Sequence, residues 1–197
     1  IYDNAIKNGK KVMIIEVGNL KRGTTWRLSL NHINNQGMFG NIDDLDPNRH
    51  KLLGVNLSPI QNVRRNEILV VAQHQNSLQW IGMPPMQEWA TRIISTVRQF
   101  SSRPIIVRPH PRSPFTISVK NVVLDRPQRL PNTYDGFNFN SNYHCVINHN
   151  AGGAVKAAID GVPVICDKSS LAAELSGSIT DIDNIQRNAT WIMNHMR

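Results

Sequence analysis

Short apolar runs separated by longer polar or amphipathic stretches are the main pattern of this chain. The runs are rich in Val and Ile and end at polar residues, which is typical of buried strands. They cover residues 11–17, 68–73, 104–108, 121–125, 143–150 and 162–167. A near-continuous apolar strand indicates a sheet that is covered on both faces, as parallel sheets are.

Helical patterns lie between these strands. Residues 86–100 place apolar side chains at the spacing of one helix face, which predicts an amphipathic helix. Further helices are predicted at 152–160, 169–176 and 181–196. Because strands alternate with helices, we expect right-handed βαβ units and an α/β fold, with a Rossmann-like parallel sheet and helices on both faces.

The regular alternation begins only at residue 67, which suggests two parts. Residues 67–197 would form the Rossmann-like domain. Residues 1–65 would form a partial or reduced N-terminal region, in which the Asn-, Gly-, Asp- and Pro-rich segment 34–66 is a loop or linker.

Composition narrows the class of protein. Of 197 residues, 40% are hydrophobic and 18% are charged, which is a globular composition. No stretch reaches the roughly 18 apolar residues of a membrane span, and the N-terminus lacks the apolar core of a signal peptide. Cys145 and Cys166 lie in predicted buried strands, which favours reduced thiols and a cytoplasmic protein of a bacterium or a phage-infected host.

The net charge of +8 favours a polyanionic partner, either a glycan or DNA, although solubility alone also accounts for it. The basic residues are partly clustered near the N-terminus, at Lys7, Lys10, Lys11, Lys21, Arg22 and Arg27.

Polar and basic residues follow four of the predicted strands. In an open parallel sheet the ligand crevice lies at the carboxyl ends of the strands, so we expect these residues to converge there. They are Gln73 and His74; Arg108, His110 and Arg112; Asn148, His149, Asn150, Gly152 and Gly153; and Asp167, Lys168, Ser169 and Ser170.

The segment NHNAGG, residues 148–153, has two interpretations. Its glycines let a phosphate approach the backbone N–H groups at a helix start. Alternatively, it is an ordinary strand-to-helix turn in which Asn148 or Asn150 caps the helix. The segment lacks both the Walker spacing and the GxGxxG fingerprint, which disfavours a P-loop ATPase or an NAD enzyme.

The segment RPHPR, residues 108–112, places two guanidinium groups and an imidazole on a stretch stiffened by prolines. Such groups bind phosphate or carboxylate and can protonate a leaving oxygen. The alternative is a rigid polar turn at the surface. Ser169 and Ser170 would cap the next helix or bind phosphate while doing so. No HExxH or GxSxG motif occurs, so we expect no metal and no serine-hydrolase site.

Three blocks, IIEVGNLKRGTTWRLSLNHIN (14–34), VRPHPR (107–112) and INHNAGGAVKAAIDGVPVI (147–165), resemble bacterial capsule polysaccharide glycosyltransferases and phage proteins of that kind. The resemblance implies the GT-B architecture, with residues 67–197 similar to its C-terminal, donor-binding half.

The same resemblance implies roles for individual residues. Arg108, His110 and Arg112 would contact the donor phosphate, and His110 would take part in catalysis. Glu16 would be the general base, or alternatively a partner of Lys21 or Arg22 in a salt bridge. Arg22 and Arg27 would bind the acceptor. The nucleotide side would be lined by His149, Asn150, Gly152, Gly153, Ser169 and Ser170.

The leading hypothesis is therefore a metal-independent glycosyltransferase, with a nucleotide-sugar as substrate and no cofactor. Its acceptor would be a hydroxyl of a glycan or of a modified DNA base. Two alternatives remain open: a basic nucleic-acid-binding module without catalysis, and a sugar-phosphate epimerase or glycerophosphate transferase of the same architecture.

Overall fold

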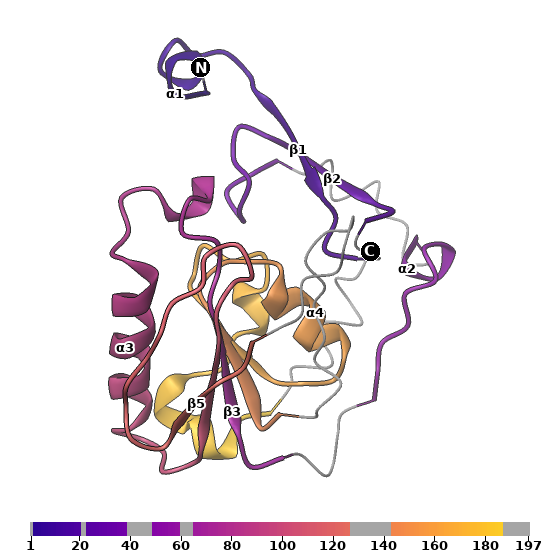
Figure 1. Ribbon diagram of the computed structural model, residues 1–197. Coiled ribbons are helices and arrows are strands. Elements are labelled where there is room, and N and C mark those ends of the chain that lie inside the picture. The colour runs from indigo at the N-terminus through magenta and orange to yellow at the C-terminus, as the bar shows by residue number, and fades with distance from the viewer. Residues whose placement is uncertain (1, 21–22, 39–48, 60–64, 127–142, 187–197) are drawn as a thin grey trace.

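A computed structural model describes residues 2–20, 23–38, 49–59, 65–126 and 143–186. Its centre is a five-stranded parallel sheet in the order β5-β4-β3-β6-β7 (Figure 1). The strands are β3 (Ile68–Val71), β4 (Ile105–Arg108), β5 (Val122–Leu124), β6 (Cys145–Asn148) and β7 (Val164–Ile165). The predicted α/β fold with a parallel sheet is confirmed.

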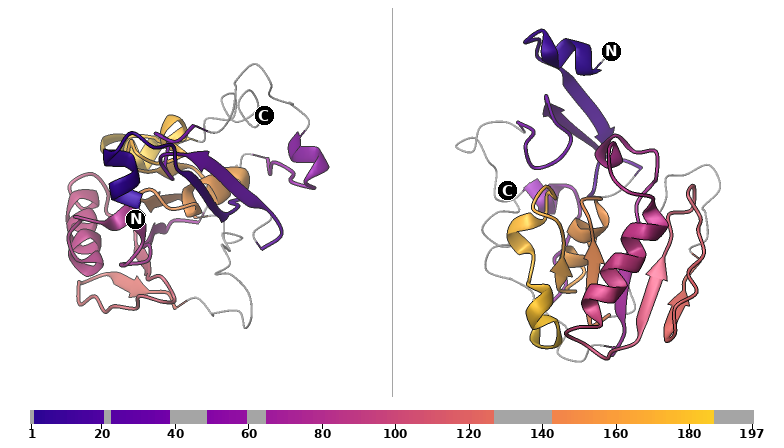
Figure 2. Two further views of the ribbon diagram at one scale, coloured as in Figure 1. Left: turned by 90° about the horizontal axis from the view of Figure 1, so that it is seen from above. Right: turned by 90° about the vertical axis from the view of Figure 1, so that its left-hand side faces the viewer.

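Helices cover both faces of this sheet (Figure 2). On one face, α3 (Met86–Val97) packs with the 3₁₀ helices η2 (Leu78–Trp80) and η4 (Ile179–Asn184). On the other face lie α4 (Gly153–Ile159) and the 3₁₀ helix η3 (Ala173–Leu175). Alternate residues of β3 explain this arrangement, because Ile68 and Val70 enter the first core and Leu69 and Val71 the second.

The N-terminal region forms a separate two-stranded sheet. It begins with α1 (Tyr2–Lys7), continues as β1 (Met13–Val17) and β2 (Trp26–Leu30), which pair antiparallel, and is followed by α2 (Arg49–Leu52). Gly18 closes the hairpin, and a Cβ there would lie 3.0 Å from the carbonyl oxygen of Thr25. The hairpin lies beyond the carboxyl ends of the five parallel strands (Figures 1 and 2).

The strand predicted at 11–17 exists, but its predicted burial is wrong. Met13 is 61% exposed and Ile15 is 58% exposed. Their cross-strand partners Leu28 and Leu30 share this face, and Leu28 is also exposed. A hairpin that belongs to no larger sheet has two faces, and here only the opposite one, which carries the buried Ser29, is covered.

The C-terminal helices also differ from the prediction. The segment predicted as a helix from 169 forms only η3, and the start of the helix predicted over 181–196 is the 3₁₀ helix η4. Non-helical backbone at Asp181 interrupts η4, while Ile182 and Ile185 are buried against the core. Residues 187–196 lie outside the described residues. Similarly, segment 34–66 is described only in part, and its role as a linker stays a prediction.

Candidate functional site

The carboxyl ends of β4, β3, β6 and β7 are adjacent, because these four strands are neighbours and all run in the same direction. We call this border of the sheet, with the residues that immediately follow the four strands, the carboxyl edge. It is the border that faces the hairpin of β1 and β2 (Figure 1). The polar residues that follow these strands therefore lie along one edge of the sheet. Their contacts show which of them interact.

Two histidines meet at the ends of β3 and β4. The rings of His74 and His110 lie edge to face, with centroids 5.2 Å apart. The Nδ1 atom of His74 accepts a hydrogen bond from the backbone N–H of Asn76, and Nδ1 of His110 accepts one from Arg112, each at 3.1 Å. Because Nδ1 is the acceptor in both rings, the neutral imidazoles carry their proton on Nε2. Both rings are thereby set as N–H donors.

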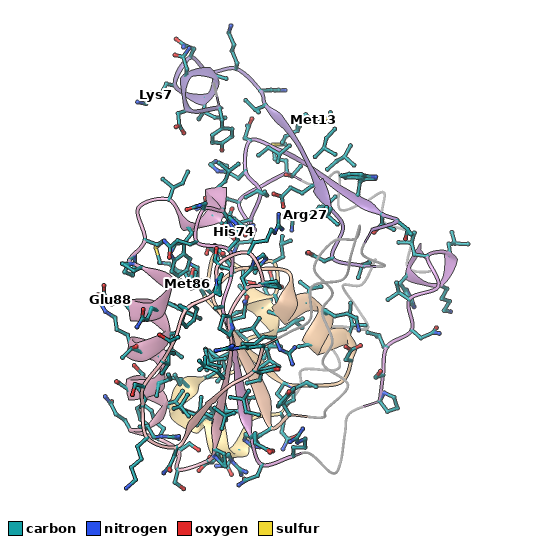
Figure 3. All side chains as sticks on the ribbon, viewed as in Figure 1. Lys7, Met13, Arg27, His74, Met86 and Glu88 are labelled. Carbon is teal, nitrogen blue, oxygen red and sulfur yellow. The ribbon has the colours of Figure 1, made fainter. Side chains whose placement is uncertain are left out.

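The two loops that hold these histidines are fastened to each other. The backbone N–H of Gln75 donates to the hydroxyl of Ser113 at 3.1 Å, and the side-chain oxygen of Gln75 accepts from the first residue of α3, Met86, at 2.6 Å. The backbone of Ser113 also donates to the carbonyl of His110 at 2.9 Å. The histidine pair therefore rests on a connected loop structure. In Figure 3 the labelled His74 lies at the end of the sheet that faces the hairpin, on which Arg27 is labelled.

A second network joins the ends of β3, β6 and β7. The side-chain amide of Asn150 donates to the hydroxyl of Ser169 at 3.1 Å, and that hydroxyl donates to the Asp167 carboxylate at 2.7 Å. The backbone N–H of Asn150 donates to the side-chain oxygen of Gln73 at 3.4 Å. The backbone N–H of Asp167 donates to the carbonyl of His149 at 2.9 Å. Three strand ends are thus linked through one buried asparagine.

Two buried acceptors in this region have no hydrogen-bond partner among the residues that the structure describes. They are the side-chain oxygens of Asn148 and Asn150, whose residues are 2% and 6% exposed. Neither asparagine caps α4, because the cap residue is Gly152 and neither side-chain oxygen accepts a hydrogen bond from the described residues; the Asn148 amide donates to the carbonyl of Val71 at 3.0 Å. The capping interpretation is therefore wrong. An unpaired buried acceptor is costly, and it is satisfied when a donor from water or from a ligand reaches it.

His149 lies between aromatic rings and a carboxylate. Its ring lies edge to face with Trp80 and with Trp89, at centroid distances of 5.0 and 6.4 Å, and its Nδ1 atom lies 4.0 Å from the Asp167 carboxylate. Burial lowers the pKa of His149, against the opposing effect of Asp167. Burial also disfavours ionisation of Asp167, yet the side-chain and backbone hydrogen bonds from Ser169 hold its pKa below the ordinary value. The pair is therefore an uncharged imidazole beside an ionised carboxylate at neutral pH.

The two arginines of the RPHPR segment lie differently. Arg108 forms a salt bridge with Asp125, at 2.6 Å, and also donates to the hydroxyl of Tyr143 at 3.3 Å. An anionic ligand at Arg108 would have to compete with Asp125. Arg112, by contrast, is exposed, and its backbone N–H orients His110. The predicted joint contact of these groups with one phosphate stays a prediction.

The glycines and serines of the predicted site also differ in their contacts. Gly152 lies at the start of α4 with an ordinary helical φ of −60°, and Gly153 is buried in the helix. Ser170 is buried, and its hydroxyl accepts from the backbone N–H of Ala172, which is a local structural role. Ser169 instead belongs to the network with Asn150 and Asp167.

The hairpin residues form a pair of their own. Arg27 and Glu16 are directly opposite on β2 and β1 and form a salt bridge at 3.1 Å. Glu16 is thus paired with Arg27; Arg22, the other predicted acceptor-binding residue, lies outside the described residues, as does Lys21. The segment that follows the hairpin reaches the carboxyl edge, since Asn35 donates to the carbonyls of Lys168 and, at 3.2 Å, Ser169.

Trp80, the last residue of η2, is 2% exposed and has no site role predicted from the sequence. No sequence signal distinguishes it from an ordinary core tryptophan. Gln73, His74 and Asp167 are expected at the crevice from their positions at predicted strand ends, but the sequence assigns them no individual role.

Within the ranges that the structure describes, no three His, Cys, Asp or Glu side chains are grouped to hold a metal ion. Nor does any helix in those ranges have the length and apolar character needed to cross a membrane.

A comparison of the sequence with protein-family models gives no match, and a comparison with curated proteins gives no significant match. The fold and the arrangement of the carboxyl edge are therefore the basis for an assignment of function.

Proposed function

We propose that this protein is a glycosyltransferase that moves a sugar from a nucleotide-sugar donor to a hydroxyl acceptor. The observation that carries the proposal is the carboxyl edge, where hydrogen-bonding side chains from four parallel strands lie beneath a hairpin that bears a carboxylate. Parallel α/β sheets bind ligands at this position. The two free cysteines agree with action in a reducing cytoplasm.

The donor phosphates would bind at the ends of β3 and β4. His74 and His110 are fixed with their protons on Nε2, so each is suited to donate to a phosphoryl oxygen. The exposed Arg112 would add positive charge beside them. These groups would stabilise the negative charge that develops on the nucleotide as it leaves, which is the larger part of catalysis in such transfers.

The sugar would lie toward the ends of β6 and β7. A sugar hydroxyl is a hydrogen-bond donor of the kind that the unpaired oxygens of Asn148 and Asn150 require, once a side-chain adjustment opens them. Glu16 would take the proton of the acceptor hydroxyl. The acceptor oxygen then bonds to the anomeric carbon, the bond from that carbon to the phosphate oxygen breaks, and the nucleotide leaves with the bonding electrons.

A second candidate is a nucleic-acid-binding module without catalysis. The observation that favours it is the exposed basic group Lys7, Lys10 and Lys11 together with the exposed Trp26 at the other end of the hairpin, on a chain of net charge +8. Lysines neutralise the phosphate backbone and an exposed aromatic ring can stack on a base. This candidate leaves the polar network at the carboxyl edge without a role.

Nucleotide binding tests the proposal first. We expect UDP, CMP or GDP, or one of their sugars, to raise the melting temperature of the protein. His74→Ala with His110→Ala should remove most of that increase, since hydrogen bonds to charged groups contribute about 1.5–3 kcal/mol each. Lys120→Ala removes an exposed charge near β5 and should leave the increase unchanged. No stabilisation by any of these compounds, together with tight and salt-sensitive DNA binding, would refute the transferase and favour the binding module.

Release of nucleotide from the donor sugar tests the catalytic part. With water as acceptor, Glu16→Gln should slow the release by about 10²–10⁴-fold, because it removes a general base. The same variant should bind the nucleotide as the unmodified protein does. Unchanged release in Glu16→Gln would exclude Glu16 as the base.

A further inference from the structure

A pocket of about 390 Å³ opens at the carboxyl ends of β4 and β5, beside the histidine pair. Small-ligand pockets have volumes of roughly 300–1,000 Å³, so this one is large enough for a compact organic ligand. The described residues that line it come from the segment after β4 and from the end of β5: Pro109, His110, Pro111, Pro114, Phe115, Thr116, Leu124 and Arg126.

The chemistry of this lining selects a planar, largely apolar group. Five of the eight residues are Pro, Phe or Leu, which offer flat or apolar surfaces and no side-chain hydrogen bonds. A sugar, with a hydroxyl on most carbons, would leave its donors unpaired there. A heteroaromatic base instead stacks on aromatic and flat apolar surfaces and needs polar groups only at its edge. Thr116 and Arg126 provide such groups.

The position of His110 connects this pocket to the site described above. His110 lines the pocket and also forms the edge-to-face pair with His74. Its ring orientation is fixed by the backbone N–H of Arg112. A nucleotide has the same order of chemical groups, with a base at one end and phosphates beyond the ribose.

We propose that this pocket holds the base of the nucleotide, with Phe115 as its stacking surface, and that His110 stands between the base site and the phosphate site. This inference rests on the proposed function and adds the direction in which the donor lies. The nucleotide would run along the carboxyl edge from β5 toward β6 and β7, with the base at the β5 end and the sugar near Asn150.

Binding titrations with parts of the nucleotide separate the two sites. The probes are UDP, CMP and GDP, the nucleosides uridine, cytidine and guanosine, and inorganic pyrophosphate. We expect Phe115→Ala to weaken the binding of the nucleotide and of its nucleoside by about 5- to 150-fold, since a stacked base contributes this much. Pyrophosphate binding should not change. His110→Ala should weaken nucleotide and pyrophosphate together, and His110→Gln, which keeps an N–H near the Nε2 position, should restore part of both.

Two further variants guard against a purely structural effect, because Phe115 also packs against the core. Phe115→Leu keeps an apolar side chain but removes the aromatic face, and it should weaken the nucleoside as well. Phe100→Leu changes a phenylalanine that is 40% exposed in the turn after α3, and this variant should bind every probe normally.

The outcomes distinguish this inference from the proposed function. If nucleotides bind the unmodified protein and both Phe115 variants bind them equally well, the base pocket is refuted while nucleotide binding stands. If the Phe115 variants lose pyrophosphate along with the nucleoside, the effect is structural and the pocket is again refuted. If no nucleotide or nucleoside binds the unmodified protein, both proposals fail.

Discussion

Ser169 offers a sharp test of the network at the carboxyl edge, because its hydroxyl is both a donor and an acceptor. It donates to the Asp167 carboxylate at 2.7 Å and accepts from the buried amide of Asn150 at 3.1 Å. The substitution Ser169→Ala removes both bonds while deleting a single atom. Asp167 keeps a hydrogen bond from the backbone N–H of residue 169 and is partly exposed, so water replaces the lost donor there.

The larger effect falls on Asn150. This residue is only 6% exposed, and its side-chain oxygen has no hydrogen-bond partner in the described part of the chain, so the substitution would remove the partner of its amide nitrogen as well. A buried polar group without a partner costs about 1–3 kcal/mol. With a smaller contribution from Asp167, we expect Ser169→Ala to lower the free energy of unfolding by about 2–3 kcal/mol. At about 2–4 °C per kcal/mol for a chain of this size, the melting temperature would fall by about 4–12 °C.

This effect is measured by urea unfolding of four proteins: the unmodified protein, Ser169→Ala, Asn150→Ala and the double variant. If the two side chains depend on each other, Ser169→Ala should cost about 1–2 kcal/mol less when Asn150 is already Ala, which is within the usual range for residues in contact. Ser118→Ala, at an exposed serine, should change stability by less than about 0.5 kcal/mol. Additive effects of Ser169→Ala and Asn150→Ala would show that the network does not hold the three strand ends together.

Two other predictions follow from buried titratable groups. Burial lowers the pKa of His149, so the unfolded chain binds a proton at this imidazole more tightly than the folded protein does. The stability that depends on neutral His149 is therefore present above pH roughly 6.5, the ordinary pKa of histidine. It is lost as the pH falls from there through the lower pKa of the folded protein. From pH 8 to pH 5 the melting temperature should therefore fall less steeply for His149→Gln than for the unmodified protein. An equal fall in both proteins would contradict a lowered pKa of His149. Burial also raises the pKa of the Cys166 thiol, and Cys145 is fully buried, so the native protein should react slowly with a disulfide reagent at pH 8. In the denatured protein both thiols should react rapidly with the reagent. An equally fast reaction of the native protein would refute the burial of the two cysteines.

The fold was predictable from the sequence where burial was complete. β3 and β6 are buried at every residue, and continuous apolar runs such as ILVV and CVI are typical of strands that are covered on both faces. The run MIIEV of β1 has a similar apolar character, but its predicted burial is wrong. Its odd and even residues face different environments, and a run of five residues does not reveal that one face is open to solvent.

The candidate site was predictable in position but not in orientation. The direction of the strands brings their ends to one edge, which requires only that the sheet be parallel. The direction of a side chain depends on its neighbours in space. Arg108 and His110 are two residues apart, yet Arg108 pairs with Asp125, which follows β5, whereas His110 contacts His74 in the loop after β3. The contact between Trp80 and His149 depends on how the loop after β3 folds back, and no local pattern specifies it.

The attachment of the hairpin decides whether Glu16 can act at the carboxyl edge. A two-stranded hairpin is marginally stable alone, and one face of this hairpin is exposed, so its position depends on contacts elsewhere. The described contacts with the edge run from Asn35 to the backbone carbonyls of Lys168 and Ser169. The side chain of Ser169 belongs to the network of Asn150 and Asp167. Under the proposed function, a donor that orders this network would also order the support of the hairpin. Under the proposed function, the proton acceptor would therefore be held most firmly over the edge when the donor is bound.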